Sequence, residues 1–65
     1  MGKLIYQKTI EPFRIYVYDN EHEKKIVINK IIEYENGEKY VQHFSFFDME
    51  LNVLSDLMKN AREVL

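Results

Sequence analysis

Apolar and polar residues alternate with the two-residue period of β-strands along most of the first 47 positions. The alternation is clearest after Pro12, where Phe13, Ile15 and Val17 share one face of the chain. Arg14, Tyr16 and Tyr18 share the other face of the same segment. The pattern predicts four strands, over residues 3–10, 13–18, 25–34 and 39–47.

Turn signals separate these four segments. Glu11-Pro12 interrupts the first two, because proline removes a backbone donor and favours a bend. Residues 19–24 form a polar turn, and Asn36-Gly37 is the strongest short hairpin signal in the chain. The polar pair Asn29-Lys30 breaks the apolar third segment, so we expect a β-bulge there. That segment is apolar on both sides, which indicates that both of its faces are covered in part.

The last third of the chain changes to the spacing of an amphipathic helix. Its apolar positions are Leu51, Leu54, Leu57, Met58, Ala61 and Leu65. Asp48 is a favourable N-cap residue, and Glu50 lies in the first turn, where the helix dipole favours a carboxylate. The order of elements predicts a single α+β domain over residues 1–65, a four-stranded antiparallel sheet followed by one C-terminal α-helix. Phe13, Ile15, Val17, Phe44 and Phe46 are expected to face that helix.

The size of the chain bears on its assembly. A domain of 65 residues buries only about 60% of its unfolded surface. Yet 46% of its residues are hydrophobic, and it has no cysteine that could form a disulfide. Two small cores merged into one would use this apolar material. We therefore expect a homodimer, with the stripe Leu51, Leu54, Met58 and Leu65 of the helix in the interface.

Signs of catalysis are weak. His22 and His43 are not spaced as metal ligands, and the two glycines, Gly2 and Gly37, cannot form a phosphate-binding loop. We expect no enzyme activity, no metal and no cofactor. No apolar run approaches the roughly 20 residues of a membrane span, and no signal-peptide pattern is present. These features predict an intracellular protein, of the cytoplasm or nucleoid, without a membrane partner.

The aromatic and basic residues of the predicted strands suggest a binding surface. Tyrosines beside cations on an exposed sheet face provide base stacking and phosphate neutralisation. The candidate nucleic-acid-binding residues are Arg14, Tyr16, Tyr18, Lys24, Lys25, Lys30, Tyr34 and Lys39. The alternative is that these tyrosines form ordinary cross-strand pairs or a dimer surface. The net charge of −2 does not favour nucleic acid, so the local placement of charges decides between the two.

The order of short motifs resembles one known family. These motifs are Phe13-Arg14-Ile15-Tyr16-Val17, Lys25-Ile26-Val27-Ile28-Asn29, Glu33-Tyr34, Asn36-Gly37-Glu38 and Phe44-Ser45-Phe46. Over roughly residues 4 to 65 they resemble the transcriptional coactivator positive cofactor four family, whose members bind single-stranded DNA. The resemblance implies four antiparallel strands and a helix, dimerisation through helices and sheets, and curved sheet surfaces that hold single strands.

By position, the resemblance implies a stacking role for Tyr34 and places Lys24 and Lys25 near a basic turn. It matches Phe44-Ser45-Phe46 to the family's Ile-Ser-Leu entry to the helix, with Leu51 at its helix aromatic. The segment before that entry departs from the family, because residues 39–43 contain one lysine and no glycine. A basic N-terminal tail, found in some members, is also absent from this sequence.

Two functions of different classes follow. The first is a homodimeric module that binds single-stranded DNA or RNA without sequence specificity, in transcription, replication or repair. The second is a protein-interaction or structural homodimer of the same fold that binds no nucleic acid. Lysines around the tyrosine face would favour the first. Glutamates there would favour the second, the candidates being Glu11, Glu21, Glu23, Glu33 and Glu35.

Overall fold

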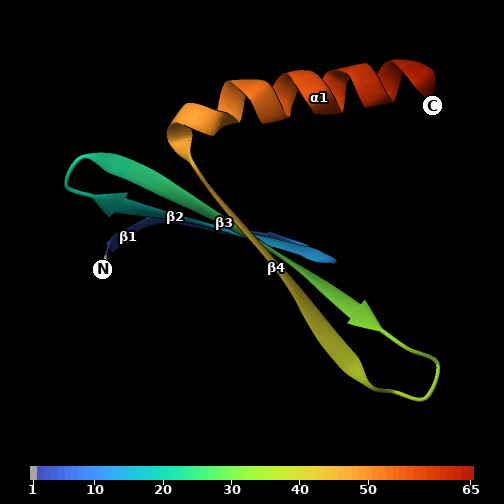
Figure 1. The fold of residues 1–65 in the computed structure, drawn as a ribbon. Helices are drawn as coiled ribbons and strands as arrows, with labels where there is room; N and C mark the ends of the chain where they lie inside the picture. The colour runs from blue at the N-terminus through green and yellow to red at the C-terminus, as the bar shows by residue number, and fades with distance from the viewer. Residues whose placement is uncertain (1) are drawn as a thin grey trace.

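The chain folds into one antiparallel sheet followed by a helix, as the computed structural model shows for residues 2–65 (Figure 1). The strands are β1 (Lys3–Ile10), β2 (Phe13–Asn20), β3 (Glu23–Glu33) and β4 (Lys39–Phe47). They lie in the order β1-β2-β3-β4, so each hairpin joins neighbouring strands. The predicted α+β fold of four antiparallel strands and a C-terminal helix is confirmed.

Short turns join the strands. Glu11 and Pro12 connect β1 to β2, at the expected bend. Between β2 and β3 only Glu21 and His22 remain unpaired, so the expected polar turn over residues 19–24 is too long. Polar residues can remain in a ladder because its hydrogen bonds join backbone groups, whatever the side chains.

The β3–β4 hairpin turns at Gly37, as Asn36-Gly37 predicted. Gly37 has φ +88°, a conformation that glycine adopts without steric cost. The Gly37 amide donates to the Tyr34 carbonyl at 2.9 Å, and the Glu38 amide donates to Asn36 Oδ1 at 3.0 Å. These bonds hold the turn.

The only register shift between paired strands of residues 2–65 lies in β1, between Leu4 and Tyr6. The bulge expected at Asn29-Lys30 is wrong, because β3 keeps continuous register with both neighbours there. The polar pair belongs to the regular ladder, in which Asn29 and Lys30 point to opposite faces.

The helix begins through a short 3₁₀ turn, η1 (Asp48–Glu50), before α1 (Leu51–Val64). The expected N-cap role of Asp48 is wrong, because Asp48 lies within η1 and makes no side-chain cap bond. Instead Glu50 Oε1 accepts a hydrogen bond of 3.0 Å from the backbone N–H of Phe47. This bond satisfies one of the free donors at the start of the turn.

Strand register divides the side chains between two faces of the sheet. We call one the helix face, because it lies toward α1; its apolar members are Phe13, Ile15, Val17, Ile26, Ile28, Phe44 and Phe46. We call the other the open face; its central members are Arg14, Tyr16, Tyr18, Lys25, Val27, Asn29, His43 and Ser45. The five residues predicted to face the helix do lie on the helix face.

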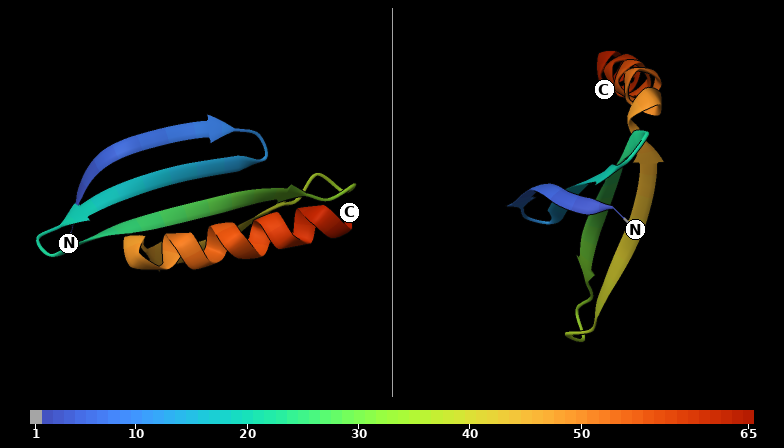
Figure 2. Two further views of the ribbon diagram at one scale, coloured as in Figure 1. Left: turned by 90° about the horizontal axis from the view of Figure 1, so that it is seen from above. Right: turned by 90° about the vertical axis from the view of Figure 1, so that its left-hand side faces the viewer.

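The core of one chain is small. Within residues 2–65 only Ile26, Val27 and Phe46 are buried, with 8%, 8% and 7% of their surface exposed. α1 has no buried residue. Figure 1 shows α1 leaving the twisted sheet at the end of β4, and the right-hand view of Figure 2 shows α1 nearly end-on and set apart from the strands. The sheet and the helix therefore face each other without closing a common core.

Candidate nucleic-acid interface

Three cross-strand rows form the centre of the open face. Their members, in order along β2, β3 and β4, are Arg14, Asn29 and His43; Tyr16, Val27 and Ser45; and Tyr18, Lys25 and Phe47. Residues in one row lie about 5 Å apart from strand to strand. Each row therefore combines a cation or a tyrosine ring from β2 with at least one polar or charged side chain from β3 or β4.

Tyr16 and Tyr18 form the aromatic part of this surface. Their ring centroids are 6.5 Å apart and their planes differ by 24°, so the rings are nearly parallel. Both residues are half-buried, and Val27, which lies opposite Tyr16, is buried although α1 is on the other face. The two tyrosines therefore shield the apolar centre of β3 from solvent, and part of each residue stays exposed to solvent.

Cations flank the tyrosines. Arg14 precedes Tyr16 by two residues on β2, and Lys25 lies directly opposite Tyr18 on β3. The acidic residues of the open face lie at the two ends of β3, Glu23 beside the β2–β3 turn and Glu33 opposite Lys39. Lys39 lies eight residues along β4 from the Lys25 row, which is roughly 26 Å. The centre of the open face therefore carries positive charge, whereas its ends also carry carboxylates.

Asn29 and His43 add a polar contact that the sequence analysis did not assign to this surface. His43 Nδ1 lies 2.9 Å from Asn29 Oδ1, so a proton on Nδ1 is donated to the amide oxygen. The position of the Asn36-Gly37 turn predicts that these two residues are paired. Counting equally outward from Asn36 along the hairpin pairs Asn29 with His43, next to Arg14.

Three of the eight candidate residues lie away from this surface, Lys24 and Lys30 on the helix face and Tyr34 in the β3–β4 loop. Lys24 pairs in register with Asp19, and Lys30 Nζ lies 5.9 Å from the ring centroid of Phe13. Tyr34 lies in the β3–β4 loop, where its ring meets that of Tyr40 edge to face at 5.1 Å. The structure brings together Arg14, Tyr16, Tyr18 and Lys25, and it places Lys39 farther along the same face. Successive residues of a strand point to opposite faces, so an odd or even position decides the face on which a lysine lies. Nearness to the tyrosines in the sequence does not decide it.

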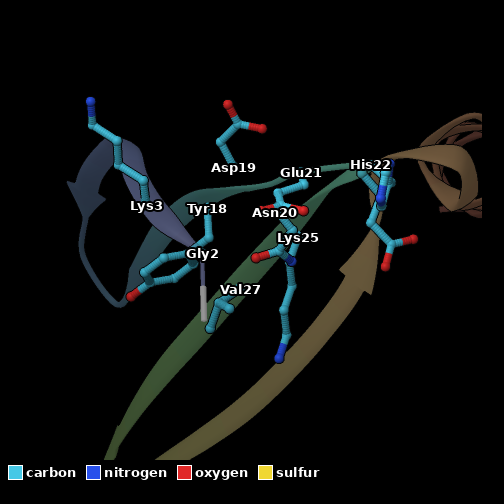
Figure 3. A pocket seen from close by; sticks show the side chains of 10 residues that line it. Gly2, Lys3, Tyr18, Asp19, Asn20, Glu21, His22, Lys25 and Val27 are labelled. Carbon is cyan, nitrogen blue, oxygen red and sulfur yellow. The ribbon is translucent and has the colours of Figure 1, made fainter.

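An open hollow of about 820 Å³ lies at the turn end of this face (Figure 3). Tyr18, Lys25 and Val27 line it, together with Glu21 and His22 of the β2–β3 turn. Figure 3 shows the side chains of Lys3 and Asp19 directed away from those of Tyr18, Lys25 and Val27. The hollow adjoins the Tyr18 row, and three carboxylates, those of Asp19, Glu21 and Glu23, also line it near the β2–β3 turn.

Among residues 2–65, no group of three or more histidine, aspartate or glutamate side chains is placed to hold a metal ion. The one long helix in this part of the chain, α1, is too short and too polar to cross a membrane.

Comparison with known proteins leaves the resemblance as a prediction. No protein-family model, curated protein or solved structure matches this chain.

Proposed function

We propose that the chain binds single-stranded nucleic acid, DNA or RNA, across the open face of its sheet and without sequence specificity. The observation that carries this proposal is the nearly parallel pair Tyr16 and Tyr18, flanked by Arg14 and Lys25 on the face that α1 leaves uncovered. Every base has a π face, so stacking on tyrosine does not discriminate among sequences. The flanking cations would contact the phosphates that connect the stacked bases.

The placement of charges on the open face supports nucleic-acid binding, although the chain as a whole is acidic. The net charge of the chain is −2, but Glu23 and Glu33 lie at the ends of the face, and Arg14 and Lys25 lie beside the rings. A single strand can follow the central rows without passing directly over a carboxylate. The same order of strands and helix is what the resemblance to the positive cofactor four family implies.

The alternative function is a protein-interaction or structural homodimer that binds no nucleic acid. The overall acidic charge favours this alternative, because it weakens long-range attraction to polyanions. In that case the half-buried tyrosines would belong to a protein contact surface.

A salt-series titration with a fluorescent single-stranded oligonucleotide tests the proposal. We expect a dissociation constant in the micromolar range or lower at low salt, weaker binding to duplex of the same sequence, and weakening as salt is added. Oligonucleotides of unrelated sequence should bind with similar affinity. Absence of binding at low salt, where attraction is strongest, would overturn the proposal in favour of the alternative.

A further inference from the structure

One row of the open face carries a nitrogen-bearing polar side chain from each of β2, β3 and β4. Arg14 lies opposite Asn29 in the strand register, and Asn29 lies opposite His43. Directly opposite residues point to the same face and lie about 5 Å apart. Arg14 and His43 are exposed, and Asn29 between them is half-buried. A phosphate above Asn29 would therefore have Arg14 on one side and His43 on the other.

A hydrogen bond fixes the polar groups at the β4 side of this row. His43 Nδ1 lies 2.9 Å from Asn29 Oδ1. An amide oxygen only accepts, so Nδ1 carries the proton, and Nε2 of a neutral His43 has a lone pair. The same bond occupies the oxygen of Asn29 and leaves the two donors of its NH2 group. Among residues 2–65 no other hydrogen bond joins side chains of two different strands.

The immediate surroundings of His43 are neutral or cationic. On β2 its titratable neighbours are Arg14, in the same row, and Tyr16, in the next row. Arg14 stays charged at every pH at which the protein is studied. Uncharged side chains surround His43 on the same face of β3 and β4, namely Val27, Ile31, Val41 and Ser45.

The carboxylates of the open face lie away from this row. Glu33 is paired in register with Lys39, four residues before His43 on β4 and roughly 13 Å from it. Glu23 is the first residue of β3, six residues before the row. Glu11 lies in the β1–β2 turn, at the edge of the sheet opposite to β4. The charge that a bound anion would meet first is therefore that of Arg14.

Two members of the row can donate to a phosphate oxygen at any pH, the Arg14 guanidinium and the Asn29 amide. His43 differs from them, because the lone pair of a neutral Nε2 repels a phosphate oxygen. A proton on Nε2 makes the imidazole a second cation and a third donor. Histidine is the side chain whose ordinary change of charge lies between about pH 5 and 8. A bound phosphate therefore favours the form of His43 that carries both protons.

We propose that Arg14, Asn29 and His43 form a phosphate-binding subsite of the open face, and that His43 takes up a proton at Nε2 when a phosphate of a single strand binds there. This inference rests on the proposed nucleic-acid binding and adds two residues and a pH dependence to it. The protonated imidazole attracts the polyanion, so affinity increases as the pH falls and decreases as the pH rises.

A titration with a fluorescent oligothymidylate at low salt tests the proton uptake. Thymine takes up no proton in the range where histidine titrates, about pH 5 to 8, so a change of affinity reports on the protein. The parent should bind this probe about tenfold tighter at pH 5.5 than at pH 8, the effect of one hydrogen bond from a charged donor. Absence of binding at both pH values would overturn the proposed function, and this inference with it.

Two histidine variants separate His43 from the other titrating groups. His43→Gln keeps a hydrogen-bonding side chain that cannot become charged, and it should lose most of the change of affinity with pH. His22→Gln removes the histidine of the β2–β3 turn and should keep that change. Titration of the carboxylates is common to both variants, so it does not affect their comparison. Binding that is independent of pH in the parent, or equally dependent on pH in His43→Gln, would overturn the inference and leave nucleic-acid binding in place.

Two asparagine variants locate the phosphate. At pH 8, Asn29→Asp places a carboxylate in the row and should weaken binding by about tenfold or more, because like charges then face each other. Asn52→Asp makes the same change of charge on the polar side of α1 and should leave the affinity nearly unchanged. Circular dichroism confirms that both variants are folded. Equal affinities of the two variants would show that no phosphate lies above Asn29.

Discussion

Ile26 and Val27 are consecutive residues of β3, and both are buried, on opposite faces of the same sheet. Ile26 lies on the helix face between Val17 and Phe46, and Val27 lies on the open face between Tyr16 and Ser45. The sheet therefore has apolar contacts on both sides at its centre. Different side chains cover the two sides, which allows stability and binding to be tested separately.

Phe46 is the most deeply buried aromatic side chain of the described chain. Phe46→Ala should lower the free energy of unfolding by about 3–5 kcal/mol, because it removes a ring from the small core and leaves a cavity. Phe47→Ala, at the next residue, changes an exposed ring on the open face and should cost about 1 kcal/mol. Denaturant unfolding at one protein concentration measures both losses. A larger loss from Phe47→Ala than from Phe46→Ala would show that the two faces have been exchanged.

Lys24 and Lys25 are adjacent lysines on opposite faces, which makes them a matched pair. Lys25→Gln should weaken binding of a single strand and reduce the slope of log K against log salt by about 0.7, the value for one phosphate contact. Lys24→Gln makes the same change in net charge on the helix face and should leave that slope unchanged. Fluorescence titrations at four or more salt concentrations give both slopes. The proposed face would be wrong if Lys24→Gln produced the larger change.

Tyr18 and Tyr34 compare the two locations of candidate stacking residues. Tyr18→Leu keeps an apolar side chain on the open face but removes the ring, and it should weaken oligonucleotide binding by about 1–3 kcal/mol. Tyr34→Leu removes the partner of Tyr40 in the β3–β4 loop and should leave affinity nearly unchanged. Circular dichroism confirms that each variant is folded before its titration. Loss of affinity in Tyr34→Leu alone would favour the stacking role that the family resemblance implies.

Gly37 is expected to set the stability of the β3–β4 hairpin. Gly37→Ala should lower the free energy of unfolding by about 1–2 kcal/mol, because a side chain disfavours φ +88°. A Cβ at this position would meet no other atom of the described chain within 4 Å, so the loss would come from the backbone alone. Gly37→Asn should lose less, since asparagine tolerates the left-handed region. Thermal unfolding of the two variants compares them, and equal stability of Gly37→Ala and the parent would exclude a backbone constraint here.

The bounds of β1 and β4 and the Asn36-Gly37 hairpin could be predicted, because alternation and a positive-φ glycine are local properties. The bulge near Leu4 and the 3₁₀ turn before α1 could not. A bulge depends on how two strands pair, and a single strand's pattern does not contain that information. Asp48 has the chemistry of an N-cap, but the chain enters a 3₁₀ turn at this residue and Glu50 bonds to Phe47 instead.

The candidate site shows the same limit. Arg14, Tyr16 and Tyr18 share one face of the sheet, as their alternation within one strand predicts. Lys24 and Lys30, predicted for this surface, lie on the helix face, because they alternate in β3 with Lys25 and Asn29 and so point the same way as Ile26 and Ile28. Prediction of the Asn29–His43 contact requires the register between β3 and β4. The centre of the hairpin determines that register.

The order β1-β2-β3-β4 also affects how fast a newly made chain folds. Each pairing joins neighbours along the chain, so the sheet can grow hairpin by hairpin, and single hairpins form in about 1–10 μs. If the chain assembles as the homodimer that the sequence predicts, burial of the apolar stripe of α1 requires a collision with a second chain, so its rate scales with protein concentration. Between these two steps the chain carries a formed sheet and an uncovered apolar helix. The dilute, newly made protein is then most exposed to aggregation, and rapid dilution from denaturant should show a fast first phase and a slower, concentration-dependent second phase.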